Sequence, residues 1–472
     1  MPFTWSLRRP YIKCSTEDGQ TKIMITRRTL LRMTVRSLGA LGAASCLGRL
    51  SRVYAASSSE ADYKALVCIF LYGGNDGNNL IVPVKTDAQG YGDYQRVRGA
   101  TLGLPQNTLG LIHARGGKEV YGLHPQLGAL REIYEHGKLT FVANVGTLTK
   151  PITKHEYQQG SAVPLNLFSH SDQQQQWQMA SIPGAPHNGW AGRAADLLAA
   201  LNAPSSFPIG VSTAGNSLLL TGNQPQASII NGQLGLDGSD GSQAENARDA
   251  AFQQILKFES GMALIQKVNR VTTDGLDAAR QLNAALSMGS PLKTSFPGSN
   301  SGRQLEEVAR IIHVRKNLGV NRQIFYISLG DFDTHSDAMP RQNALLGELS
   351  AAMAAFYNAT AEMGVEKQVV SFTESEFGRT LQPSSGAGSD HAWGSHHMVM
   401  GAAVKGAEIH GTFPVLALQG PEDVTGRGVW LPTISLEQYG ATLASWFGVD
   451  DPSLVKVFPN LPNFTPRKLA FL

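Results

Sequence analysis

Apolar runs about as long as β-strands recur along the chain, and segments with helical spacing separate them. The strand-length runs cover residues 65–72, 139–145, 323–329, 368–373 and 397–404. Such runs, without polar alternation, are typical of strands buried on both faces of a sheet. Helical patterns occupy 125–136, 190–201, 303–318, 341–363 and 436–447. The alternation predicts an α/β fold with a mostly parallel sheet flanked by helices.

Two polar segments interrupt this alternation. Residues 236–246 and 287–303 are rich in Gly, Ser, Asn and Pro and are predicted to be exposed loops. Residues 247–288, between them, have a helical pattern throughout. This region is either a helical hairpin inserted over the sheet or two ordinary crossover helices. We predict one α/β domain over 56–472, with the helical insertion at about 245–290.

Composition places the chain among ordinary globular proteins. It has 472 residues, of which 42% are hydrophobic and 16% charged. Arginines and glycines interrupt every apolar stretch before it reaches the ~18 residues that a membrane-spanning helix needs. A polytopic membrane protein is therefore excluded.

Basic residues are concentrated at the N-terminus. Residues 1–55 contain ten Lys/Arg against two acidic residues, so the rest of the chain is mildly acidic although the overall net charge is +3. Its remaining basic residues are scattered, which argues against nucleic-acid binding.

The same region has the features of an export leader. Arg27-Arg28, followed by two leucines, resemble a twin-arginine signal, and the small-residue spacing at Val53-Tyr54-Ala55 is typical of a cleavage site. We predict an export signal over 1–55, beginning at Met1 or Met24, and a periplasmic protein. The alternative is an N-terminal helix that packs on the body. Of the three cysteines, only Cys68 would remain after cleavage, as a lone buried thiol.

Acidic residues follow three of the predicted strands. They and their neighbouring candidate ligands are Asp76 after 65–72; Asp331, Asp333 and His335 after 323–329; and Glu376, Asp390 and His391 after 368–373. The carboxyl ends of parallel strands meet at one edge of the sheet. Carboxylates that converge without cations repel one another, which either raises a pKa or requires a metal ion.

The ligand types limit the choice of ion. Mixed oxygen and imidazole ligands suit zinc or manganese, whereas oxygen ligands alone suit calcium or magnesium. Each motif also has a structural interpretation. Asp76 could lie in a tight turn, Asp331 and Asp333 could cap a helix, and Glu376 could pair with Arg379.

Five motifs in a fixed order resemble a known family. They are Gly73-Gly74-Asn75-Asp76-Gly77, Phe168-Ser169-His170, Asp333-Thr334-His335, Ser375-Glu376-Phe377-Gly378-Arg379 and Asp390-His391. In this order, behind a twin-arginine leader, they resemble a large family of exported bacterial proteins of unknown function that is grouped with the alkaline phosphatase and sulfatase superfamily. The resemblance implies an alkaline-phosphatase-like fold with a divalent-metal site at the carboxyl end of the sheet.

The resemblance also implies roles for individual residues. Ser169 would be the nucleophile at a helix N-terminus, with plain N-capping as its alternative, and Arg379 would balance charge on the transferring group. The implied metal ligands are Asp76, Asp331 or Asp333, His335, Glu376, and Asp390-His391.

Two departures from the superfamily pattern limit these implications. Phe377 stands where a metal-binding histidine is expected, and the mature chain lacks the Cys/Ser-Pro-Arg motif of formylglycine sulfatases. Our hypothesis is an exported metal-dependent hydrolase of phosphate or sulfate esters, with a small anionic ester as substrate and the twin-arginine export machinery as partner. The alternative is a non-catalytic exported binding or assembly protein that keeps the fold and one structural ion.

Overall fold

The computed structural model describes residues 62–85, 90–115, 120–180, 188–223, 227–229, 243–258 and 261–472. The predicted leader lies outside these residues. They belong to one compact unit, Glu60–Leu472. Among the residues described, no helix is long and apolar enough to cross a membrane.

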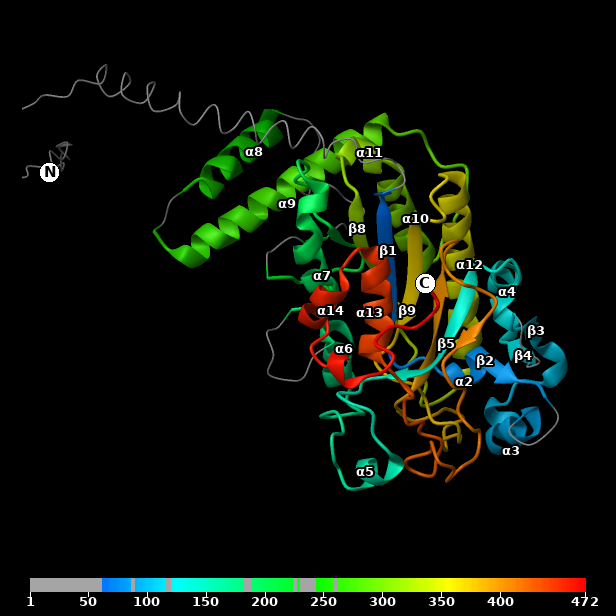
Figure 1. Ribbon diagram of the computed structural model, residues 1–472. Helices are drawn as coiled ribbons and strands as arrows, with labels where there is room; N and C mark the ends of the chain where they lie inside the picture. The colour runs from blue at the N-terminus through cyan, green and yellow to red at the C-terminus, as the bar shows by residue number, and fades with distance from the viewer. Residues whose placement is uncertain are drawn as a thin grey trace, which may run out of the picture. The chain divides into compact units, whose positions relative to one another are not determined.

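A nine-stranded mixed sheet forms the centre of this unit (Figure 1). Its strands, from one edge to the other, are β11 (Ile409–His410), β5 (Leu139–Gly146), β10 (Ser395–Met400), β9 (Val369–Glu374), β1 (Lys64–Leu71), β8 (Arg322–Leu329), β6 (Gly210–Ser212) and β7 (Ala227–Ile229), with β12 (Ile434–Ser435) also paired to β5. Strand β10 runs antiparallel to both of its neighbours, and the other pairs are parallel. The predicted mostly parallel sheet is confirmed.

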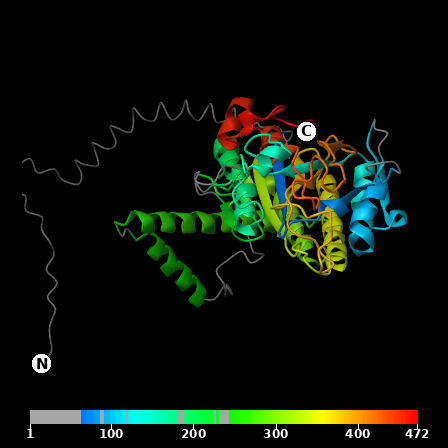
Figure 2. The ribbon, with the colours of Figure 1, turned by 90° about the horizontal axis from the view of Figure 1, so that it is seen from below.

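Helices cover both faces of the sheet (Figures 1 and 2). One layer contains α4 (Gly128–Glu135), α10 (Asn300–His313) and α12 (Ala338–Glu362), and the other contains α6 (His170–Met179), α7 (Trp190–Leu198), α13 (Leu436–Phe447) and α14 (Asp451–Val457). Successive side chains of β1 alternate between the layers: Val67 and Ile69 enter the first core, and Cys68 and Phe70 the second. This alternation explains why β1 has no polar face.

Smaller elements surround the sheet. A second, three-stranded sheet contains β2 (Ile81–Pro83), β4 (Val120–Leu123) and β3 (Gly110–His113). Among the residues described, the remaining α-helices are α2 (Gly77–Leu80), α3 (Tyr91–Leu102), α5 (Lys154–Gln158), α8 (Gln243–Leu256), α9 (Ala263–Met288) and α11 (Arg315–Leu318).

Most of the predicted strands and helices are present, but several boundaries differ. The helix expected over 303–318 is divided at Val314 into α10 and α11, and α10 begins at Asn300, inside the loop predicted over 287–303. Strand β10 ends at Met400, earlier than expected, because Gly401 adopts a φ of +154° and the chain turns. The helical region expected over 247–288 is divided into α8 and α9, with Gly261 at a φ of +72° between them. The two helices project from the rest of the compact unit in both ribbon views (Figures 1 and 2).

Candidate metal centre

The loops after β1, β8 and β9 meet at the carboxyl ends of these strands. Gly73, after β1, donates its N–H to Glu376 Oε1 at 2.8 Å. Its φ is +114°, and a Cβ at this position would lie 2.2 Å from the backbone nitrogen of Asp333, after β8. Only glycine allows the first loop to approach the second this closely.

Three side chains form a group that could hold a metal ion. Ligand atoms of His170, Asp333 and His391 all lie within 4.8 Å of one another. The Nε2 atoms of His170 and His391 are each 3.4 Å from a carboxylate oxygen of Asp333. Ligands about 2.0–2.1 Å from a tetrahedral zinc ion are separated by roughly 3.3 Å, so these spacings suit such an ion.

A fourth side chain, His335, lies beside this group. Its Nε2 is 3.1 Å from Asp333 Oδ1 and 3.0 Å from His391 Nε2. The side chains of His335 and Asp333 are 48% and 43% exposed, so solvent reaches this side of the group. His335 therefore offers a further imidazole nitrogen at the open side.

Hydrogen bonds at Nδ1 orient the imidazoles of the group. His170 Nδ1 donates to Glu376 Oε1 at 2.8 Å, and His391 Nδ1 donates to the carbonyl of Phe168 at 2.8 Å. These partners leave Nε2 of each ring directed at Asp333, and His170 Nε2 is buried without a hydrogen-bond partner. Histidines that bind metals usually have such a partner on the other ring nitrogen.

The same arrangement occurs at His335. Its Nδ1 lies 3.3 Å from Asp390 Oδ1, and the other oxygen of Asp390 accepts a hydrogen bond from Arg427 at 2.5 Å. Asp390 is thus placed to orient His335 and is itself held by a guanidinium group.

Buried Arg379 fixes Asp333. It donates to the carbonyls of Gly73, Gly74, Phe332 and Ser389 and to Asp333 Oδ1. Partial burial pushes the pKa of Asp333 upward, but Arg379, helped by nearby histidines, outweighs it and lowers that pKa to about 2. Asp333 is therefore ionised at neutral pH, the form that a cation requires.

The imidazoles of His170 and His391 have different environments. The hydrogen bond to Glu376 raises the pKa of His170, whereas burial lowers the pKa of His391. His391 is thus favoured in the neutral form that binds metals.

Phe377, the departure from the expected pattern, packs against the metal-site histidines. Its ring stacks on His391 with centroids 4.6 Å apart and contacts His170 at 4.9 Å. The side chain is 1% exposed. At the position of the expected imidazole ligand, the protein therefore has an aromatic ring that packs against the imidazoles of His170 and His391.

These residues lie within a region that matches a known family. Residues 63–451 match the family described as "Protein of unknown function (DUF1501)". The chain belongs to this family. The residues of this DUF1501 member that match the family include the three loops and the metal-site group of His170, Asp333 and His391. No curated protein matches the chain.

Two solved structures are similar to this DUF1501 chain at low identity. A crystal structure of Ps i-CgsB in complex with k-i-k-neocarrahexaose is 9% identical, with a TM-score of 0.31, and the alignment covers 84% of this chain and 77% of that one. A crystal structure of a mutant of the alkaline phosphatase PafA is 12% identical, with a TM-score of 0.26, over 69% of this chain and 64% of that one. Neither likeness transfers a residue role or a substrate to this chain.

The predicted ligands are placed in different ways in this DUF1501 member. Asp333 and His391 are in the central group, with His335 beside it. Glu376 instead contacts Nδ1 of His170, and Asp390 contacts Nδ1 of His335.

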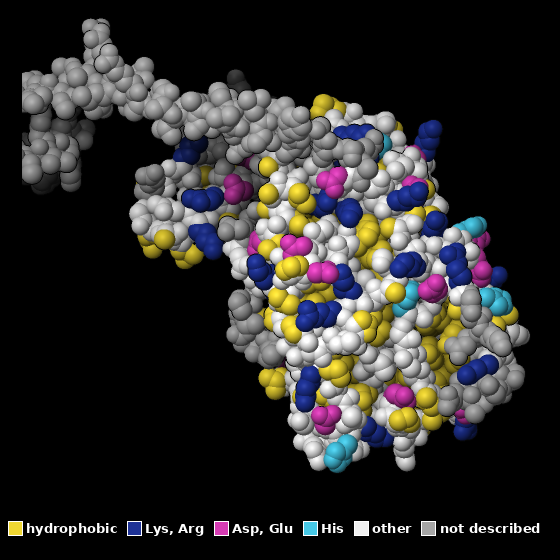
Figure 3. All heavy atoms as spheres, in the orientation of Figure 1, with side chains coloured by type: hydrophobic (Ala, Val, Ile, Leu, Met, Phe, Trp, Pro, Cys, Tyr) yellow, Lys and Arg dark blue, Asp and Glu magenta, His cyan; other side chains and the backbone are white. Residues whose placement is uncertain are grey.

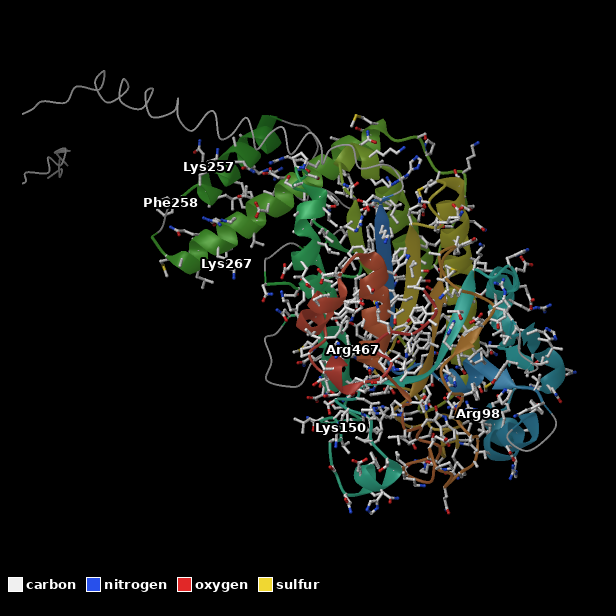
Figure 4. The ribbon with its side chains drawn as sticks, viewed as in Figure 1. Arg98, Lys150, Lys257, Phe258, Lys267 and Arg467 are labelled. Atoms are coloured by element: carbon white, nitrogen blue, oxygen red, sulfur yellow. The ribbon has the colours of Figure 1, made fainter. Side chains whose placement is uncertain are left out.

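Asp76 and Asp331 also lie outside the metal-site group. Asp76 pairs with Arg98, which comes from α3 (Figure 4), and accepts a hydrogen bond from the backbone nitrogen of Asn78 at the start of α2. Asp331 is exposed, has a φ of +71°, and accepts a hydrogen bond from Arg341 through its backbone carbonyl.

Ser169 and His170 are neighbours at the start of α6 but have different contacts. Ser169 caps α6, and its hydroxyl lies 2.5 Å from Asp172 Oδ2. His170, the next residue, is the ligand candidate that sequence reasoning missed. His170 lies within the motif Phe168-Ser169-His170, but only folding brings it close to Glu376, which is 206 residues away in the sequence.

Proposed function

We propose that this protein is a metal-dependent hydrolase with one divalent ion held by His170, Asp333 and His391. The observation that carries the proposal is the convergence of two Nε2 atoms on one carboxylate, with both Nδ1 atoms held by hydrogen-bond acceptors. The nitrogen and oxygen donor set favours zinc or manganese over calcium or magnesium.

The exposure of the site supports catalysis over a purely structural ion. Structural zinc sites are closed by four protein ligands, whereas catalytic sites keep a position for water or substrate. Here Asp333 and His335 are each more than 40% exposed. A divalent ion in such a site supplies Lewis-acid activation of water and of an ester oxygen. In this scheme His335 is a fourth ligand or accepts a proton at Nε2, and Asp390 holds its Nδ1.

Two guanidinium groups at the rim support an anionic ester as substrate. Arg341 donates to the carbonyls of Asp331 and Asp333 at 3.2 and 3.4 Å, and Arg427 binds Asp390. Both arginines are partly or fully exposed. Guanidinium groups bind phosphate and sulfate oxygens through paired hydrogen bonds, so a phosphate or sulfate ester fits this rim.

Metal analysis and turnover test the proposal together. We expect about one zinc or manganese ion per purified chain and hydrolysis of an aryl phosphate or aryl sulfate. His170→Ala and Asp333→Asn should lose both the ion and the turnover. His136→Ala, which changes an exposed histidine elsewhere, is the control and should keep both. A wild-type protein without a bound ion contradicts the proposal.

Ser169→Ala distinguishes two nucleophiles. Because Ser169 caps α6, we expect this variant to lose about 1 kcal/mol of stability and to keep its turnover, with water as nucleophile. Loss of turnover in a folded, metal-loaded variant would instead support Ser169 as the nucleophile.

A tightly bound ion without turnover on any aryl phosphate or sulfate would favour the second function, a non-catalytic binding or assembly protein. Periplasmic localisation is part of the proposal, and its support is the twin-arginine pattern of the leader.

A further inference from the structure

Helix α9 has one apolar seam along its length, and the parts of the chain that the structure describes bury one half of it. Positions alternating by four and three residues form the seam: Leu264, Val268, Val271, Gly275, Ala278, Leu282 and Ala285. Ala278, Leu282 and Ala285 are buried in the main core. Leu264, Val268 and Val271 are 71%, 54% and 44% exposed. The spacing is that of the contact positions of a coiled coil.

The free end of the helical hairpin adds further exposed apolar surface. Ile255 and Phe258, at the end of α8, are 63% and 68% exposed. Figure 4 labels Phe258 beside Lys257 and Lys267 at this end, and Figure 3 shows hydrophobic side chains gathered there next to basic ones. An apolar end of this kind is typical of an interaction surface.

A cavity lies alongside the exposed half of α9. Its volume is about 1020 Å³, and it separates α9 from residues 199–223. Lys267, Val271 and Asp274 line it from the side of α9. There is consequently room for side chains of another helix beside the seam.

The charges along α9 are complementary to those of a second, antiparallel α9. Lys267 and Arg270 lie toward the free end, and Asp274 and Asp277 follow toward the core. In an antiparallel pair with Val268 opposite Val271 of the second copy, Lys267 comes beside Asp274 of the second copy, and the symmetric pair repeats this contact. The two Lys267–Asp274 contacts then join opposite charges.

We propose that the exposed half of α9 binds the same half of a second copy of this chain, forming an antiparallel, two-fold symmetric contact. This inference is independent of the metal site. A lipid surface fits less well, because Asp274 and Asp277 lie among the basic residues of α9. The polar side of an interfacial helix is usually rich in Lys and Arg, which attract anionic lipids, whereas carboxylates are repelled.

A charge exchange tests the contact directly. Sedimentation velocity of the full chain over a concentration series should show a monomer–dimer equilibrium. Lys267→Asp and Asp274→Lys should each weaken association about tenfold or more, because each places like charges opposite one another. The double variant K267D/D274K should restore association. Restoration cannot result from a loss of folding, which separates the contact from a structural role.

Further variants test the seam and its alternatives. Val268→Asp should give a folded monomer, whereas Leu111→Asp, at a 47% exposed leucine on β3, should still dimerise. A wild-type chain that stays monomeric at all concentrations overturns the proposal. A second result would also overturn it: the wild type stays monomeric and binds phosphatidylglycerol vesicles, and Val268→Asp abolishes this binding. The seam would then be a lipid-binding surface.

Discussion

At the scale of single residues, the position of Asp333 depends on contacts from separate loops. Arg379 holds its carboxylate, and Gly73 leaves space for its backbone. The acidic residues that follow β1 and β9 have other roles. Asp76 neutralises buried Arg98, and Glu376 orients His170. Only one of these three carboxylates therefore remains in the metal-site group.

Gly73→Ala should disrupt the candidate metal centre although residue 73 is not one of its proposed ligands. The added Cβ would meet the backbone of Asp333 at 2.2 Å, and the φ of +114° disfavours any other residue. We expect metal affinity to fall about 10–100-fold, as for losses of groups that orient ligands, with a stability cost of about 1–3 kcal/mol. Competition with a chromogenic chelator measures the affinity. Gly128→Ala, where a Cβ meets open space, is the control and should bind metal normally.

Asp76→Asn separates a metal ligand from a structural ion pair. Arg98 is fully buried and would lose its charged partner, so the free energy of unfolding should fall by about 3–5 kcal/mol. The metal content of the folded variant should be unchanged. Urea denaturation and elemental analysis measure the two quantities. An unchanged stability together with a lost ion would make Asp76 a ligand.

At the scale of elements, β9 serves two purposes at its carboxyl end. Glu374, its last residue, lies in the interior near Cys68, whereas Glu376, two residues later, reaches the site. Burial raises the pKa of Glu374 from 4.5 to about 8, and neighbouring Trp190 and Cys68 only partly oppose it. The fold thus buries the carboxyl group of Glu374 in the interior and uses that of Glu376 to orient His170.

Glu374 should make the protein less stable as the pH rises. The unfolded chain releases this proton near pH 4.5 and the folded protein near pH 8, so between these values the unfolded chain binds fewer protons and the free energy of unfolding falls. The upper limit of the loss is about 4–5 kcal/mol. Glu374→Gln should reduce the difference in urea stability between pH 5 and pH 8. Exposed Glu135→Gln should leave that difference unchanged, and an equal pH dependence of wild type and Glu374→Gln would contradict the assignment.

At the scale of the whole molecule, the candidate metal centre joins three segments that are far apart in the sequence. His170 is the first residue of α6, Asp333 follows β8, and His391 lies between β9 and β10. A bound ion stabilises only the folded state, in which these segments are together. Metal binding and global stability should therefore be linked.

Removal of the ion should lower the stability of the folded protein. At a free metal concentration of 100 times the dissociation constant, binding contributes about 2.7 kcal/mol, so treatment with a chelator should lower the melting temperature. Readdition of zinc or manganese should restore it. His170→Ala should melt at the same temperature with and without chelator. A wild type that is insensitive to both treatments would argue against an ion at this site.

Much of the architecture was predictable from the sequence. Strands such as β1 are apolar on both faces, and this local pattern persists whatever their neighbours are. The meeting of the three loops was predictable as well, since parallel strands end at the same edge. The antiparallel direction of β10 was not, because an apolar run does not encode the direction in which a strand pairs.

The sequence by itself determined the α/β architecture, the edge of the sheet at which acidic and histidine side chains gather, and membership in the motif family. Tertiary structure decided which of these side chains share one point in space. Asp76 has Arg98 as its partner, and His170 receives Glu376. The first pair is 22 positions apart in the sequence and the second 206. The distances between such residues are fixed by packing and by the close approach that Gly73 permits, and no local pattern records them.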